Sequence, residues 1–177
     1  MKLKQIIYLF LISGVLFSCA DNQKIAPKFN HLVEQFADIR VLRYKVPGFE
    51  ELSLKEKSLV YYLTQAGLAG RDIMWDQNYK HNLKIRAALE NINANYSGDK
   101  ESDDFKAFKV YLKRVWFSNG IHHHYSNDKI KPAFTRDYFE TELLQKSSTV
   151  LAPEIVAVLF NDVDAKKVNK KEGVDNI

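Results

Sequence analysis

The spacing of apolar residues predicts helices along most of the chain. Apolar side chains at positions 29, 32, 33 and 36 repeat at the interval of a helical face, which predicts a helix over about 28–38. Residues 39–46, IRVLRYKV, mix β-branched and basic side chains and stop at Pro47-Gly48. This second segment is either a short extended piece or a loose continuation of the helix, because its pattern fits both.

A further helix is predicted to begin after residue 53. Ser53 and Glu56 have the spacing of a capping box, in which each side chain satisfies a free backbone N–H of the first turn. We expect this helix to end near Gly67 or Gly70, and to turn inward the apolar residues Leu59, Val60, Leu63 and Ala66. Another long apolar repeat covers 73–92 and stops at the turn residues of 95–99.

Three more helices are expected in the second half of the chain. The first is capped by Ser102 or Asp103 and ends at Asn119-Gly120. We assign its broad apolar and aromatic stripe to the core: Phe105, Phe108, Tyr111, Leu112, Val115 and Trp116. The other two lie near 136–146, capped by Thr135, and from Pro153 onward. Without repeats or a convincing hairpin, these patterns predict a mainly α fold of five or six packed helices.

The N-terminus has the pattern of a bacterial export signal. Lys2 and Lys4 precede an apolar run over 6–17, which is shorter than the roughly 20 residues that a membrane span needs. A small residue then precedes the single cysteine, Cys19, as in lipoproteins whose mature chain starts with a lipid-bearing cysteine. We expect a signal peptide at 1–18, a tether at 19–27 and a helical part at 28–177. The alternative is an ordinary secretory signal that is cut nearby and discards Cys19.

Charge changes this picture by excluding one class of partner. The sequence has 26 basic and 22 acidic residues, and removing 1–18 takes away two lysines and no acid. The chain without residues 1–18 therefore has a net charge of +2, which is too small to favour nucleic acid as a partner. We expect the lipid on Cys19 to hold the chain at the bacterial cell envelope, so that the membrane is its partner there.

Candidate chemistry is concentrated in His122, His123 and His124. Adjacent histidines converge poorly on a metal, because neighbours point about 100° apart on a helix and to opposite faces on a strand. The sequence contains no HExxH, GxSxG or phosphate-binding loop. Three interpretations remain: a metal site, a polar loop whose histidines bond carbonyls, or a cleft-lining loop that offers imidazoles and the Tyr125 hydroxyl to a ligand. His81, on an apolar helical face, is expected to be a hydrogen-bonded core residue rather than a ligand.

Two stretches resemble the N-terminal region of the dipeptidyl peptidase III family of zinc exopeptidases. They are YYLTQAGLAG from Tyr61 and VYLKRVWFSNGIHHHYSNDKIKP from Val110. In animal members the second stretch contains VYSNxGNYxxFGDxKFxP, and five positions of this chain fall in register with it without a gap: Val115, Gly120, Tyr125 in place of Phe, Lys129 and Pro132. The chain departs from the pattern at Ile121-His122 and Ser126-Asn127, where the GIHHHYS version is similar to that of bacterial members.

This resemblance covers the chain from about residue 28 and implies a much longer enzyme. In that enzyme, the packed helices of this chain would form part of the lower lobe of a two-lobed peptidase. The peptidase releases dipeptides from the N-termini of short peptides. The family holds zinc with an HExxGH helix, whose glutamate is the general base, and with a glutamate of a later EExRAE-like helix. None of these motifs is in this sequence. We therefore expect this chain alone to bind no zinc, to contribute no catalytic residue and to be inactive.

The resemblance also places the 119–128 loop at the substrate cleft. The candidate contact residues are Asn119, Gly120, His122, His123, His124 and Tyr125. The competing hypothesis is a complete, lipid-anchored helical binding module that uses the His122–Tyr125 loop for a ligand.

Overall fold

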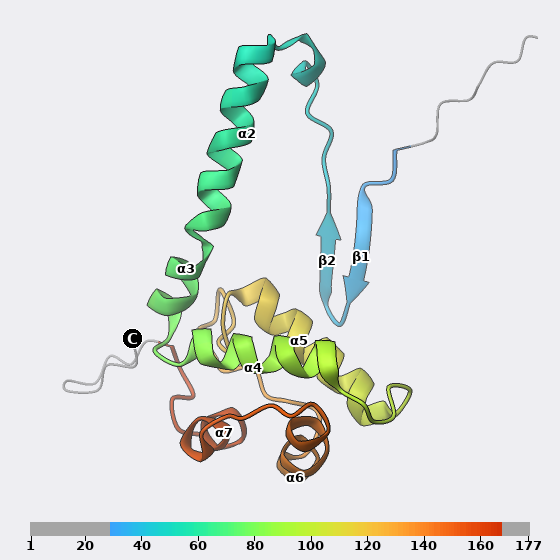
Figure 1. Ribbon diagram of the computed structural model, residues 1–177, viewed down its shortest axis with the longest axis vertical. Coiled ribbons are helices and arrows are strands. Elements are labelled where there is room, and N and C mark those ends of the chain that lie inside the picture. Colours follow the sequence, from blue (N-terminus) through green and yellow to red (C-terminus); the bar gives the residue numbers. More distant parts are fainter. Residues whose placement is uncertain (1–28, 168–177) are drawn as a thin grey trace, which may run out of the picture.

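The computed structural model describes residues 29–167 and has a mainly helical fold, as the sequence predicts. The signal peptide, Cys19 and the tether lie outside the described residues. Figure 1 shows a cluster of helices from which a hairpin and a long helix project. We call the cluster the helical core: α4 (Asn82–Asn95), α5 (Asp103–Ser118), α6 (Arg136–Tyr138), the π-helical turn η2 (Phe139–Leu144) and α7 (Pro153–Phe160). We call the projecting part the arm: β1 (Leu32–Phe36), β2 (Ile39–Leu42), η1 (Phe49–Glu51) and α2 (Leu54–Ala69).

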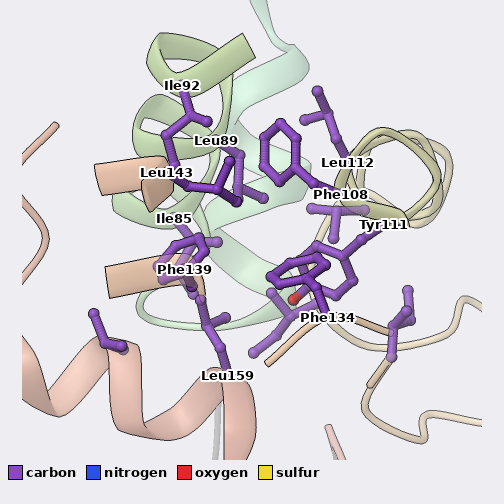
Figure 2. Packing of buried hydrophobic residues seen from close by; sticks show 14 of the residues in the cluster. Ile85, Leu89, Ile92, Phe108, Tyr111, Leu112, Phe134, Phe139, Leu143 and Leu159 are labelled. Atoms are coloured by element: carbon purple, nitrogen blue, oxygen red, sulfur yellow. The ribbon is translucent and has the colours of Figure 1, made fainter. Parts of the chain in front are cut away.

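The helical core is closed by side chains from all of its longer helices. Ile85, Leu89 and Ile92 of α4 face α5, and α6–η2 and α7 cover the layer that they form (Figure 2). The aromatic stripe of α5 is buried as predicted from Phe105 to Val115, whereas Trp116 remains partly exposed. Thr135 caps α6 by accepting a hydrogen bond from the Tyr138 N–H at 3.1 Å, and Pro153 begins α7. These boundaries confirm the helices predicted near 136–146 and from Pro153.

The helix predicted over 28–38 is wrong, and so is the expectation that the chain has no hairpin. β1 and β2 pair antiparallel, with Leu32 opposite Leu42 and Phe36 opposite Ile39. Ala37, in the left-handed region at φ 47°, makes the turn. The β-branched segment 39–42 supplies a partner strand, and this cross-strand pairing outweighs the helical spacing of four apolar residues. Ion pairs of Glu34 with Lys113 and of Asp38 with Arg114 tie the hairpin to α5.

Helix α2 begins and ends as predicted but does not bury the predicted face. The Ser53–Glu56 capping box is present, and Gly70 follows its last residue. None of the residues of α2 is buried, and Leu59, Val60 and Leu63 are all exposed. The prediction of an inward face is wrong because no element among residues 29–167 lies over that face to cover it (Figure 1).

The long apolar repeat over 73–92 is two helices rather than one. α3 (Arg71–Asn78) ends where Tyr79 adopts an extended conformation, and α4 starts after His81. Trp75 and Tyr79 are buried at this junction, whereas His81 is only partly covered and lies edge-on to the Tyr79 ring at 5.4 Å. His81 is therefore at a helix start and not on a helical face. No helix among residues 29–167 is long and apolar enough to cross a membrane.

Candidate functional site

The candidate site begins where α5 stops, at a turn that requires glycine. Asn119 is left-handed at φ 51°, and Gly120 follows at φ 149°. A Cβ on Gly120 would lie 2.1 Å from the Asn82 side-chain nitrogen, which is far too close for any other residue type. Asn82 is buried, donates to the Trp75 carbonyl at 3.1 Å and accepts from the Ile121 N–H at 3.2 Å. This one amide side chain fixes the start of the loop to the junction of α3 and α4.

Residues 121–130, which we call the histidine loop, fold back on themselves. The Ile130 N–H donates to the Ile121 carbonyl at 2.8 Å, and the His123 N–H donates to the Asp128 carbonyl at 2.7 Å. Ile121 and Ile130 are buried, so they bind the base of the loop into the core. The four residues between His123 and Asp128 form the tip, where Asn127 is left-handed at φ 60°.

A second segment, 163–167, holds the other side of the loop, and we call it the strap. The Lys129 N–H donates to the Ala165 carbonyl at 2.9 Å, and the Lys167 N–H donates to the Asn127 carbonyl at 2.8 Å. The Lys129 ammonium is buried and donates to the carbonyls of Val158, at 2.7 Å, and Val163. Burial lowers the pKa of Lys129 because the charged form loses water. The loop is therefore fixed on both sides, by Asn82 and by the strap.

His122 is an inward structural residue in this arrangement. Its side chain is buried, and its ring lies edge-on to Tyr79 at 5.2 Å. Nε2 is 2.8 Å from the Asp164 carbonyl, which can only accept, so the ring carries its proton on Nε2. Nδ1 is then a bare acceptor, and it has no partner among the described residues. Burial is the largest effect on His122 and lowers its pKa, which favours the neutral ring.

Tyr79 completes the contact between the strap and the core. Its hydroxyl donates to the Asp164 carboxylate at 2.6 Å, while the Asp164 carbonyl accepts from His122. Burial first, and then the Asp164 carboxylate, raise the pKa of Tyr79. The phenol therefore remains protonated and can donate. Tyr79 and His122 together hold one residue of the strap by both its side chain and its backbone.

His123 is also engaged within the loop, which leaves His124 and Tyr125 facing water. The Nδ1 atom of His123 accepts from the N–H groups of Tyr125, at 3.3 Å, and Ser126, at 3.2 Å. Tyr125 is 83% exposed, and His124 is exposed beside it. The rings of His123, His124 and Tyr125 follow each other at centroid distances of 4.4 Å, and Phe117 of α5 meets His124 edge-on at 5.1 Å. We call these four rings the aromatic ledge.

The three histidines do not fit zinc. His122 points inward to a carbonyl, and one nitrogen of His123 is taken by two backbone donors. Of the three, only His124 has no hydrogen-bond partner for either ring nitrogen within residues 29–167. Within residues 29–167 no group of three or more His, Cys, Asp or Glu side chains could hold a metal ion. The geometry therefore supports no reaction step at a metal on this loop.

The ledge offers ring faces and polar atoms for contact with a ligand. Ring faces and the Tyr125 hydroxyl are presented on a firmly held loop, which suits stacking and hydrogen bonding to an extended ligand. Asn119 contributes to the support, because its carbonyl accepts from the side chains of Asn78, at 3.1 Å, and Asn82. Two surface hollows, of about 520 and 340 Å³, lie elsewhere, against α4 and against α5.

The residues that support the loop were not singled out from the sequence. They are Asn78, Tyr79, Asn82 and Asp164. The available signal was the pair Asn78 and Asn82 on either side of Tyr79-Lys80-His81, since two poor helix formers interrupt an apolar repeat there.

No protein-family model matches this sequence, and no curated protein is significantly similar to it. A functional assignment therefore depends on the loop geometry and on the two stretches from Tyr61 and Val110.

Proposed function

We propose that this chain is the N-terminal part of a lipid-anchored zinc exopeptidase of the dipeptidyl peptidase III kind. In this proposal it forms part of the lower lobe, and its aromatic ledge borders the cleft that receives short peptides. The zinc ligands and the general base belong to the rest of the enzyme, so the chain itself supplies binding surface and support.

The observation that carries the proposal is how the positions in register with the family pattern are used in this fold. Val115 is fully buried, Gly120 makes a turn that only glycine fits, and Lys129 ties the loop to α7 and the strap. These three have packing tasks that explain them without a ligand. Tyr125 has none, since it is 83% exposed at the loop tip. Among the ledge residues, we assign Tyr125 and its exposed neighbour His124 to substrate contact.

The proposed contact is stacking and hydrogen bonding to a peptide backbone. The Tyr125 hydroxyl can donate to a peptide carbonyl, and the open nitrogens of His124 can bond a peptide amide or carbonyl. His122 and His123 act through position only, because they hold the strap and the loop tip.

The test compares the chain alone with the chain completed by its downstream polypeptide. The DNA after the codon for Ile177 is read for HExxGH, and the encoded polypeptide is produced together with the 177-residue chain. We expect zinc-dependent release of dipeptides from the pair and none from the chain alone. In the pair, Tyr125→Ala should raise KM more than it lowers kcat, and Tyr125→Phe should keep most of the ring contact. Zinc-dependent release by the chain alone, or an unrelated sequence after Ile177, would contradict the proposal.

A second candidate is a complete helical binding module, which the exposure of His124 and Tyr125 favours. It predicts that the 177-residue chain binds short peptides by itself, and that Tyr125→Ala abolishes this binding. Calorimetry with unlabelled tetrapeptides separates the two candidates, because the first predicts weak or no binding without the opposite side of the cleft.

A further inference from the structure

The smaller of the two surface hollows, about 340 Å³, lies where the turn of the hairpin meets α5 and the segment after the histidine loop. Its volume is within the range of small-ligand sites, about 300–1,000 Å³. The small side chains of three alanines leave this space open: Ala37, Ala107 and Ala133. Two cationic side chains, Arg114 and Lys131, complete the polar part of the lining, and none of the described lining residues is acidic.

Both cations have donors to spare for a ligand. Arg114 is paired with Asp38 through one of its terminal nitrogens, and the Lys131 ammonium is paired with Asp162 at 3.1 Å. A guanidinium has five N–H donors and an ammonium has three, so each of these ion pairs engages only part of the cation. The side chains of Asp38 and Asp162 are largely exposed, and ion pairs in water hold their partners weakly.

The charge and the walls of the hollow together select a class of ligand. Cations without an acidic neighbour in the lining favour an anionic group, and the planar fork of a guanidinium matches a carboxylate. The apolar walls favour a short hydrocarbon group beside that carboxylate, because a bare inorganic anion would leave them in water.

The larger hollow, of about 520 Å³, lacks this combination. Lys84 is the single cation among its lining residues. The Asn91 side-chain nitrogen, which also lines it, already donates to the Ser147 carbonyl at 3.3 Å and to the Thr149 hydroxyl at 2.8 Å. The smaller hollow is therefore the stronger candidate for a ligand site.

We propose that the smaller hollow binds a carboxylate carried on a short aliphatic group. Arg114 and Lys131 contact the carboxylate, and the alanine side chains contact the hydrocarbon. Two sources share this chemistry, a short fatty acid and the C-terminal residue of a peptide. The inference is independent of the proposed function, because it uses neither the aromatic ledge nor the zinc-bearing part of an enzyme.

Amide NMR spectra of the 177-residue chain, titrated with hexanoate or with N-acetylleucine, test the site. The matched uncharged probes are hexanamide and N-acetylleucinamide, which keep the aliphatic group and lose the carboxylate. We expect saturable shifts at Ala107, Arg114 and Ala133 with at least one carboxylate and with neither amide. The signals of Ala87, at the larger hollow, and of Tyr125 should not move. A response to hexanoate alone would name a fatty acid as the source, and a response to N-acetylleucine alone would name a peptide C-terminus.

Two pairs of variants locate the binding within the hollow. Lys131→Gln should weaken binding several-fold, and Lys106→Gln is its control because it removes the same charge from an exposed lysine that does not line the hollow. Ala133→Leu should abolish binding by filling the space. Ala87→Leu places the same side chain in the larger hollow and should leave the affinity unchanged. Both alanines are exposed, so the fold should accept either leucine.

Four results would each overturn the inference. They are the absence of saturable shifts with both carboxylates, equal affinity for the amides, unchanged affinity in Lys131→Gln, and shifts confined to residues outside the hollow. Circular dichroism of each variant shows whether a loss of binding reflects unfolding. If Ala133→Leu does not fold, the comparison of Lys131→Gln with Lys106→Gln decides.

Discussion

The helical core and the arm both contain helices with large apolar side chains, but they differ in what covers those side chains. Leu112 of α5 is fully buried, whereas Leu63 of α2 is 63% exposed. Both helices are 16 residues long, and both begin with a serine cap. Local sequence forms the two helices equally well, and only α5 has neighbours that bury its apolar face.

A hydrophobic repeat is taken to predict two properties, the formation of a helix and the burial of its apolar side. The contrast between α2 and α5 shows that the first can occur without the second. A repeat indicates which side of a helix would gain from burial, but the burial needs a partner surface at the right distance. In the core, α4, η2 and α7 provide that surface (Figure 2). In the arm nothing among residues 29–167 does so, and α2 keeps its apolar side chains exposed.

The largest effect on stability is expected from a matched pair of leucine truncations, one in the helical core and one in the arm. Leu112→Ala should lower the free energy of unfolding by about 2–5 kcal/mol, because it removes buried contacts and leaves a cavity. Leu63→Ala should change it by about 0.5 kcal/mol or less, because the side chain is already in water. Chemical denaturation followed by circular dichroism measures both. Equal losses would mean that α2 is packed in the isolated chain.

Matched glycine substitutions should give effects of opposite sign. Gly120→Ala should destabilise the fold by about 1–3 kcal/mol or more, because φ 149° and the 2.1 Å approach to Asn82 exclude a Cβ. Gly67→Ala in α2 meets no atom within 4 Å, and it should stabilise the helix by about 0.5–1 kcal/mol. Thermal melts measure the first effect, and amide exchange in α2 measures the second. A tolerated Gly120→Ala would contradict the role given to Asn82.

Helices α5 and α6 of the core could be predicted because their boundaries have local causes. Ser102 and Thr135 accept hydrogen bonds from first-turn N–H groups, and Asn119-Gly120 ends α5 in the left-handed region. Such caps use neighbouring residues only, so a sequence shows them directly. The hairpin could not be predicted in this way, because four apolar residues at helical spacing carried no information about pairing with 39–42.

The sequence drew attention to the candidate loop, but it did not show which of the loop's side chains point inward. The run His122–Tyr125 marks the loop in the sequence, but whether a ring points inward depends on residues far along the chain. Asp164, 42 positions beyond His122, accepts from its ring, and Asn82, 37 positions before Asn119, donates to its carbonyl. Only the fold brings these partners together.

Matched cap substitutions sharpen the comparison further. Ser102→Ala removes the hydrogen bond to the Phe105 N–H and should lower the global stability by about 1 kcal/mol, because α5 is part of the core. Ser53→Ala removes the corresponding bond to the Glu56 N–H. It should speed amide exchange in the first turns of α2 without moving the global unfolding midpoint, since α2 opens on its own. A common shift of the midpoint would show that the arm and the core unfold together.

The smallest effect expected is a pH dependence that comes from the core and not from α2. Burial lowers the pKa of His122 below its unfolded value of about 6.5, and the groups around the ring are Tyr79, Lys129, Asp164 and Lys167. Between the lowered pKa and about 6.5 the unfolded chain binds more protons than the folded chain. Stability should therefore fall as the pH drops below about 6.5, and level off below the folded-state pKa. Denaturation midpoints from pH 8 to 5 should show a shallower fall for His122→Gln, and an unchanged slope would remove His122 as the cause.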